Sequence, residues 1–252
     1  FGAEPHRTTV ALIGGKAQSL AALGVQGLPV PPGFIVTTAA LADQVRRDGA
    51  LNDALEAAAA ALASGDSELA VRAGQLAAVR LRAAHPSEAL RRAVAEAHRA
   101  LLVDATGPRP TRVLLAVRSS AADEDGGSHS HAGQFESVLN VSGLPALWRA
   151  IAQVWASWFT PRAIRYRLHA GREGDAAQAT PRTVPPMAVL VQQMIVPRAS
   201  GVLFTVNPVS GSRRELTLEA GPGLGEALAD GRVRADYFTL RRDPLRIVGR
   251  GL

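Results

Sequence analysis

The sequence predicts an α/β protein built from two lobes. Short apolar stretches typical of strands alternate with longer segments whose apolar residues recur at helical spacing. Residues 171–186, GREGDAAQATPRTVPP, have no hydrophobic period and are rich in glycine, proline and charge, which is typical of a boundary between compact units. We therefore expect a first lobe over residues 1–184 and a second lobe over residues 185–252.

The first lobe is expected to begin with a strand, a glycine turn and a helix. The apolar residues before Gly14 predict the short strand, and the residues after it predict the helix. The prolines of GLPVPPGFIVTT forbid a helix there and lead into a strand over residues 34–37. Residues 49–103 are rich in Ala, Leu, Glu and Arg, and their last part predicts a helix that Pro86 can start.

A buried strand and an amphipathic helix follow. The stretch VLLAVRSS, residues 113–120, predicts a strand that delivers Arg118 at its C-terminal end, where α/β proteins tend to place ligands. After the loop AADEDGGSHSHAGQFES come a strand over residues 138–141 and a helix over residues 144–159. All three tryptophans lie on one stripe of that helix, for which core packing is a better explanation than base stacking.

The second lobe is expected to be mainly β. MAVLVQQMIV and SGVLFTVNP predict strands, and ELTLEA pairs with the latter as a hairpin across the turn PVSGS. GPGLGEALADG predicts a glycine turn that enters a short helix.

Charge and composition limit the classes of partner. The net charge of +6 and the isoelectric point near 11.0 suggest nucleic-acid binding. However, the arginines are spread among 22 acidic residues and aromatic residues make up only 4% of the chain, so we expect no nucleic-acid partner. The sequence has no cysteine and no run near the roughly 18 apolar residues of a membrane span, so we expect a cytoplasmic protein without a membrane partner.

The chain contains 28 lysines and arginines in total, and Lys16 is its only lysine. A lysine is a compact point charge that arginine does not replace in a narrow space, and Gly14 and Gly15 open the backbone beside it. By its position alone, Lys16 fits equally a phosphate contact and a surface position that the bias toward arginine missed. Together with Arg118 and a loop that contains Gly133, it predicts a site for a polyphosphate. Neither a Walker A loop nor a Rossmann glycine turn is present, so the pattern belongs to neither of these nucleotide-binding folds.

Several motifs in one order make a more specific pattern. LIGGKAQSLAAL, GLPVPPGFIVTT, LAVRSSAADED, AGQFESVLNV, VLVQQMIVPRASGVLFTVNPVSG and LEAGPGLGEALADGRVRADYF resemble the N-terminal nucleotide-binding domain of phosphoenolpyruvate synthase and pyruvate phosphate dikinase. The resemblance spans roughly residues 9–240. It implies an ATP-grasp-like α+β fold with ATP between the two lobes.

The resemblance also implies roles for single residues. Lys16 and Arg118 would contact the phosphates, and Gln192 would contact the adenine or the ribose. The residues that would line the phosphate loop are Gly133, Ser137 and Val138. With Mg²⁺, ATP would phosphorylate a histidine of a separate swivelling domain, releasing AMP and phosphate, and the phosphohistidine would serve a third, acceptor-binding domain.

Two departures from the family leave alternatives open: its metal-binding motifs are absent from this sequence, and so are its phosphohistidine domain and its pyruvate barrel. Its Mg²⁺ ligands lie in a D-x-E-W-like strand and an L-Q-S-R-P-like strand, and neither motif occurs before Leu252, so we expect the second lobe to be incomplete at its C-terminus. Among the acidic residues present, Glu219 is the best candidate metal ligand, whereas Asp123, Glu124 and Asp125 are more typical of a solvated turn. His131 aligns with the phosphate loop and is not expected to be a phosphohistidine.

The acceptor is also open. The same motifs occur in the ATP domains of antibiotic phosphotransferases that modify rifamycins, and the acceptor-binding domain that would separate the two activities lies outside this sequence. The missing metal motifs favour a third alternative, which is a nucleotide-binding module without turnover.

Overall fold

The computed structural model describes residues 8–103, 113–121, 135–172, 183–229 and 231–251. The chain divides into two compact units, Phe1–Met194 and Ile195–Leu252. The division lies ten residues beyond the expected boundary at residue 184 because the strand that follows the glycine- and proline-rich segment pairs within the sheet of the first unit. Helices and two separate antiparallel sheets confirm the predicted α+β class.

The first unit contains a four-stranded antiparallel sheet in the order β1-β4-β2-β3. The strands are β1 (Gly33–Val36), β2 (Leu115–Ala121), β3 (Ser137–Val141) and β4 (Met187–Gln193). Strand β4 lies between β1 and β2 and is buried along nearly its whole length, which explains the apolar run over residues 187–191. All three pairings are antiparallel, so the parallel-sheet rule that placed Arg118 at a ligand-binding strand end does not apply: Arg118 lies in the middle of β2.

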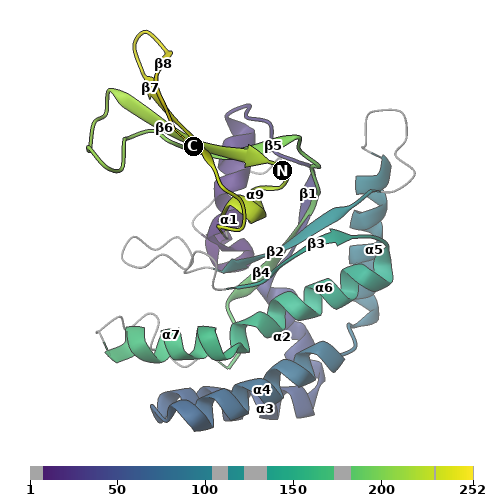
Figure 1. The fold of residues 1–252 in the computed structure, drawn as a ribbon. Helices are drawn as coiled ribbons and strands as arrows, with labels where there is room; N and C mark the ends of the chain where they lie inside the picture. The colour runs from purple at the N-terminus through teal and green to yellow at the C-terminus, as the bar shows by residue number, and fades with distance from the viewer. Residues whose placement is uncertain (1–7, 104–112, 122–134, 173–182, 230, 252) are drawn as a thin grey trace. The chain divides into compact units, whose positions relative to one another are not determined.

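Helices cover both faces of this sheet (Figure 1). Helix α1 (Thr8–Val25) packs against β1, β2 and β4, and α6 (Leu144–Ala156) packs on the other face against β2, β3 and β4. The remaining helices of the unit are α2 (Thr38–Arg47), α3 (Gly49–Ala63), α4 (Ser67–Ala83), α5 (Glu88–Val103), the 3-10 turn η1 (Ser157–Phe159) and α7 (Pro161–Arg172). The predicted helices over residues 49–103 and 144–159 are thereby confirmed.

The start of α1 corrects one prediction. The apolar residues before Gly14 are helical, not a strand, and the helix continues beyond a kink at Gly14, whose φ is 76° and ψ is 166°. A short apolar run fits a strand and a helix equally well by its periodicity, and none of the strands in the described segments pairs with this one.

The core of the first unit lies between the sheet and α6. Val117 of β2 and Val191 of β4 point into it from neighbouring strands, and Leu147 and Ile151 meet them from the helix; all four are fully buried. Trp155 and Trp158 are buried in the same cluster, which confirms core packing for these tryptophans.

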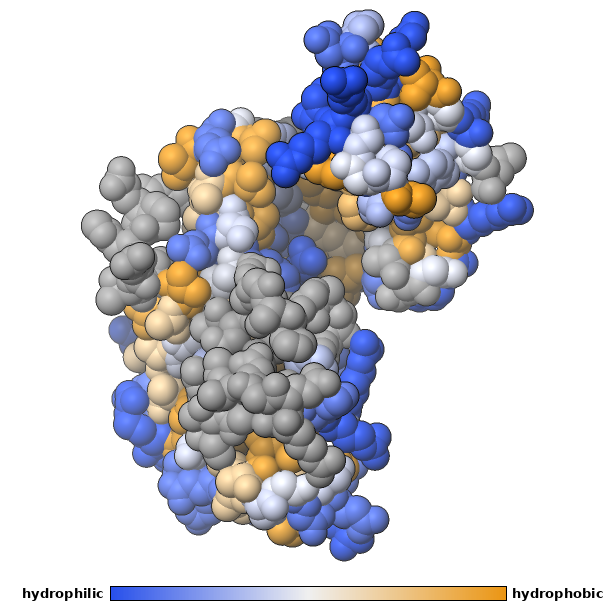
Figure 2. All heavy atoms as spheres, turned by 90° about the vertical axis from the view of Figure 1, so that its left-hand side faces the viewer, coloured by the Kyte–Doolittle hydropathy of each residue, from blue (hydrophilic) through white to orange (hydrophobic). Residues whose placement is uncertain are grey.

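The second unit is a four-stranded antiparallel sheet in sequential order, β5 (Ala199–Phe204), β6 (Glu215–Pro222), β7 (Asp236–Arg241) and β8 (Arg246–Gly251), with the short helix α9 (Gly225–Ala229). The predicted β5–β6 hairpin is confirmed, and Asn207 shapes its turn by accepting hydrogen bonds from the amides of Val209 and Ser210. The sequence reasoning missed β7 and β8. Hydrophilic side chains predominate at the upper end of this unit in Figure 2.

No helix within the described part of the chain combines the length and apolar character needed to cross a membrane.

Candidate functional site

Two of the predicted site residues, Arg118 and Gln192, lie on one face of the first sheet. Arg118 is paired with Leu190, and Gln192 is paired with Ala116, the residue two positions before Arg118. Because side chains alternate along a strand, these residues and Ser120 share the face that α1 covers. We call this face, formed by Ala116, Arg118, Ser120, Leu190 and Gln192, the α1 face.

The kink in α1 brings the helix into direct contact with β2. Gly14 is buried, and a Cβ atom at this position would lie 2.0 Å from the carbonyl oxygen of Ser120. Three residues later, the amide of Ala17 donates a hydrogen bond to the Ser120 hydroxyl at 3.0 Å. A glycine is therefore required here for two reasons. It can adopt the unusual backbone angles, and it has no Cβ atom to prevent the close approach of helix and strand.

This contact fixes the position of Lys16. Its Nζ donates a hydrogen bond to the carbonyl oxygen of Ser119 at 2.8 Å, and its side chain is half-buried. The bond places the ammonium beside β2, at the residue that follows Arg118 in the strand, while Arg118 itself is exposed. The two cations that the sequence singled out thus lie on adjacent parts of one structure, although 102 positions separate them in the chain.

Gln192 is held against the proline-rich segment before β1. Its side chain is 6% exposed, and its Nε2 donates to the carbonyl oxygen of Pro31 at 3.2 Å. Gly33 pairs with Gln192 across the sheet, and a Cβ there would lie 2.9 Å from the Gln192 Cγ and 2.5 Å from the Val191 oxygen. The sequence analysis did not single out Gly33. Its position directly after the proline run was the feature that could have indicated its role.

The phosphate-loop residues are placed differently from one another. Ser137 is exposed and pairs with Arg118 at the start of β3. Val138 is half-buried and packs against the hydrophobic core. Gly133 lies outside the described residues, as do the acidic turn at residues 123–125 and His131.

Two aromatic rings anchor the chain just before Ser137. Phe135 stacks on Trp158 with ring centroids 5.2 Å apart, and the Arg167 guanidinium lies 4.5 Å from the Trp158 ring centre. The next residue, Glu136, accepts a hydrogen bond from Gln153 of α6 at 2.7 Å. Burial lowers the pKa of Arg167 to about 10, so its guanidinium remains charged at neutral pH.

Comparison with known proteins identifies the family. The family described as "Pyruvate phosphate dikinase, AMP/ATP-binding domain" matches residues 10–252. The chain belongs to this family. The resemblance seen in the sequence motifs is thereby confirmed.

Relatives of this AMP/ATP-binding domain carry the names of several transferases. It is 40% identical over 246 residues to a rifampicin phosphotransferase of Streptomyces sviceus and 35% identical over 247 residues to a phosphoenolpyruvate synthase of Aeropyrum pernix. It is also 34% identical over 239 residues to the prodigiosin synthesizing transferase PigC of Serratia marcescens. These matches cover 94%, 97% and 94% of the chain, but only 26%, 28% and 22% of the respective relatives. The chain therefore spans about a quarter of the length of these proteins.

The described residues offer little for a metal ion. They contain no group of three or more His, Asp or Glu side chains placed to hold one. Glu219, the predicted ligand, lies in β6 of the second unit, half-buried between Val202 of β5 and Tyr237 of β7. A single carboxylate fits the way Mg²⁺ is commonly held by one or two carboxylates together with substrate phosphates, and Glu219 remains a prediction.

Proposed function

We propose that this domain binds Mg²⁺ and ATP on the α1 face and uses ATP to phosphorylate a histidine of a separate swivelling domain, with release of AMP and phosphate. The observation that carries the proposal is the shared position of three groups from distant parts of the chain. Lys16 on α1, Arg118 on β2 and Gln192 on β4 converge at a face that belongs to an AMP/ATP-binding domain.

The three side chains suit different parts of the nucleotide. The Lys16 ammonium is a compact charge held at a fixed place by the Ser119 carbonyl, which suits one oxygen of a phosphate. The exposed Arg118 fork suits two phosphate oxygens at once. Gln192 carries both a donor and an acceptor, which suits the polar edge of a base or a ribose.

These groups would act by position and charge, not by covalent chemistry. ATP supplies the phosphoryl group and its leaving group. Transfer of such a group is accelerated mainly by alignment and by neutralisation of the phosphate charge. In this proposal Lys16 and Arg118 supply fixed positive charge, and Glu219 is the candidate Mg²⁺ ligand of the second unit.

The final acceptor divides two versions of the proposal. Phosphoenolpyruvate synthase-like chemistry would deliver the phosphate to pyruvate, whereas rifamycin-type chemistry would deliver it to an antibiotic. The chain is 40% identical to a rifampicin phosphotransferase and 35% identical to a phosphoenolpyruvate synthase. We therefore keep transfer to an antibiotic as the alternative to transfer to pyruvate.

Product analysis of this domain together with its phosphohistidine and acceptor-binding domains, on the same or a separate chain, tests the proposal. The protein is incubated with Mg·ATP and either pyruvate or rifampicin, and the nucleotides are separated by chromatography. We expect AMP and phosphate to form with one of the two acceptors. ADP as the sole nucleotide product, or no turnover with bound ATP, would refute histidine phosphorylation; the latter result identifies a binding module without turnover.

A further inference from the structure

The helical layer of the first unit contains a second site that the proposed function does not use. A cavity of about 290 Å³ opens between the C-terminal end of α4, the start of α5, and helices α2 and α6. Helix α6 packs on the face of the sheet opposite to α1, so this cavity lies across the sheet from the α1 face. Its size is near the lower end of the range for small-molecule sites.

The floor of the cavity is apolar and partly aromatic. Trp148, Ala152 and Trp155 lie one turn apart along α6 and form one wall, and Leu81 of α4 contributes to the other side. Flat apolar surfaces of this kind favour a planar hydrocarbon body over a strongly hydrated ion.

The rim of the cavity is positively charged. Arg82, Arg91 and Arg149 line it from α4, α5 and α6, and no acidic side chain does. Arg91 pairs with Glu88, whereas Arg82 and Arg149 form no ion pair within the described part of the chain. Two guanidinium groups are therefore available to an anionic group at the cavity mouth.

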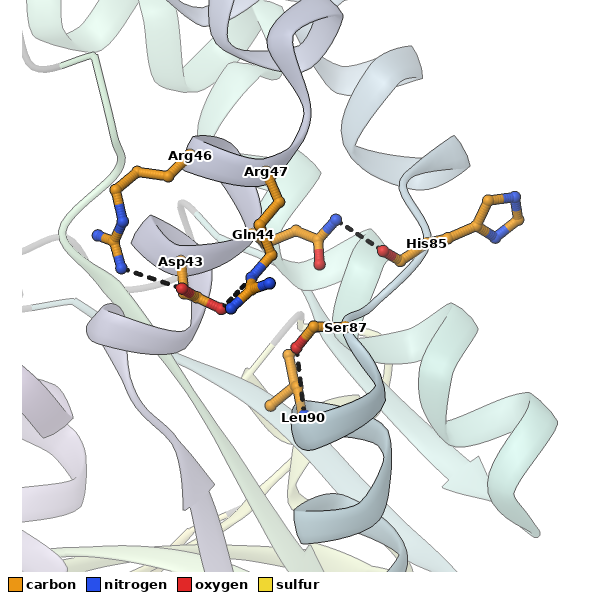
Figure 3. A network of polar contacts seen from close by, with 7 residues as sticks. All are labelled: Asp43, Gln44, Arg46, Arg47, His85, Ser87 and Leu90. Atoms are coloured by element: carbon orange, nitrogen blue, oxygen red, sulfur yellow. Dashed lines mark hydrogen bonds and ion pairs between the residues drawn. The ribbon is translucent and has the colours of Figure 1, made fainter.

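Two buried polar atoms in the lining lack partners. Gln44 and Trp155 are each only 5% exposed, and among the described residues neither the Gln44 Oε1 nor the Trp155 Nε1 has a hydrogen-bond partner. The Gln44 amide cannot be reversed without loss, because its Nε2 donates to the His85 carbonyl at 2.7 Å (Figure 3). Unpaired buried donors and acceptors are costly, but both atoms are covered by protein, so the charged rim and the apolar floor, not these atoms, define the ligand.

The surroundings of Gln44 hold the site in shape. The preceding residue, Asp43, accepts hydrogen bonds from Arg47 at 2.7 Å and from Arg46 at 3.1 Å, so its carboxylate is already paired (Figure 3). In the linker that lines the cavity, the Ser87 hydroxyl accepts from the amide of Leu90 and caps α5. Within the lining, the bond from Gln44 to the His85 carbonyl is the contact that ties α2 to the linker between α4 and α5.

We propose that this cavity binds a small aromatic carboxylic acid, with its ring on the α6 tryptophans and its carboxylate between Arg82 and Arg149. The volume has room for about ten water-sized groups, which fits a single substituted ring. The charge of the rim selects an acid over a neutral compound of the same shape, and the apolar floor selects it over inorganic phosphate.

Benzoate is a suitable probe, and the tryptophan side chains report where it binds. The chain has three tryptophans, so its ¹⁵N spectrum contains three indole N–H signals, which Trp→Phe variants assign. Benzoate is expected to shift the signals of Trp148 and Trp155, and to leave that of Trp158, which does not line the cavity, unchanged. Benzamide, the neutral analogue, and inorganic phosphate are expected to bind at least about tenfold more weakly.

Two matched pairs of variants complete the test. Arg149→Gln is expected to weaken benzoate binding about tenfold or more, whereas Arg162→Gln, an exposed arginine of α7 outside the cavity, is expected to leave it unchanged. Ala152→Leu fills the cavity and is expected to abolish the shifts, whereas the exposed Ala93→Leu is not. Equal binding of benzoate and benzamide, shifts shared by Trp158, or no shift at all would overturn the proposal.

Discussion

Replacement of Gly14 by alanine tests how α1 is attached to β2. With φ of 76° and ψ of 166°, Gly14 adopts a backbone conformation that is nearly restricted to glycine and costs another residue about 1–3 kcal/mol. The new Cβ would also lie 2.0 Å from the Ser120 oxygen, where contacts below 3.0 Å essentially never occur, so helix or strand must move by about 1 Å. Such overpacking costs about 1–3 kcal/mol more. We expect Gly14→Ala to lower the free energy of unfolding by roughly 2–6 kcal/mol.

Gly27→Ala is the matched control. Gly27 has a φ of 78°, but a Cβ there would meet no atom within 4 Å, so only the backbone cost of about 1–2 kcal/mol applies. Urea unfolding followed by tryptophan fluorescence measures both variants, since Trp155 and Trp158 report on the core of the first unit. Equal losses for the two variants would refute the claim that close contact with Ser120 requires glycine at position 14.

Three further outcomes are expected. Burial lowers the pKa of His98 below 6.5, so near that pH the unfolded chain binds more protons than the folded chain. The free energy of unfolding should therefore fall as the pH drops through about 6.5. Urea titrations of His98→Gln should show a weaker dependence of this free energy on pH. A double-mutant cycle of Phe135→Leu and Trp158→Leu should give a coupling energy of about 0.5–1.5 kcal/mol for the stacked rings, and zero coupling would contradict the stack. Gly33→Ala should displace the Gln192 side chain and so weaken ATP binding, measured by calorimetry. An unchanged dissociation constant for ATP would contradict this prediction.

Local sequence patterns predicted most elements of the first unit. The prolines before Gly33 and the apolar run over residues 187–193 left little choice but strand, and the helical spacing of apolar residues indicated α5 and α6. These patterns did not show which strands pair with one another or in which direction. A strand's sequence does not say whether its neighbours run parallel or antiparallel, and this is why Arg118 was expected at a strand end and lies in the middle of β2.

The parts of the site that sequence missed depend on contacts between distant residues. Lys16 was singled out by composition, but its bond to the Ser119 carbonyl follows from the docking of α1 on β2. The same holds for Gly33, whose role depends on the strand that pairs with it. The strands β7 and β8 were missed because arginines, a proline and two glycines interrupt any alternating pattern over residues 236–251.

The central claim is that Lys16 and Arg118 together bind the phosphates of ATP. Calorimetric titration of the chain with Mg·ATP tests it directly, with Lys16→Arg, Arg118→Ala and the exposed control Arg162→Ala measured alongside the wild type. The account predicts that each of the first two variants loses at least about 1.4 kcal/mol of binding free energy, a tenfold change, and that the control binds as the wild type does. Folded Lys16→Arg and Arg118→Ala proteins that bind ATP with wild-type affinity would contradict it.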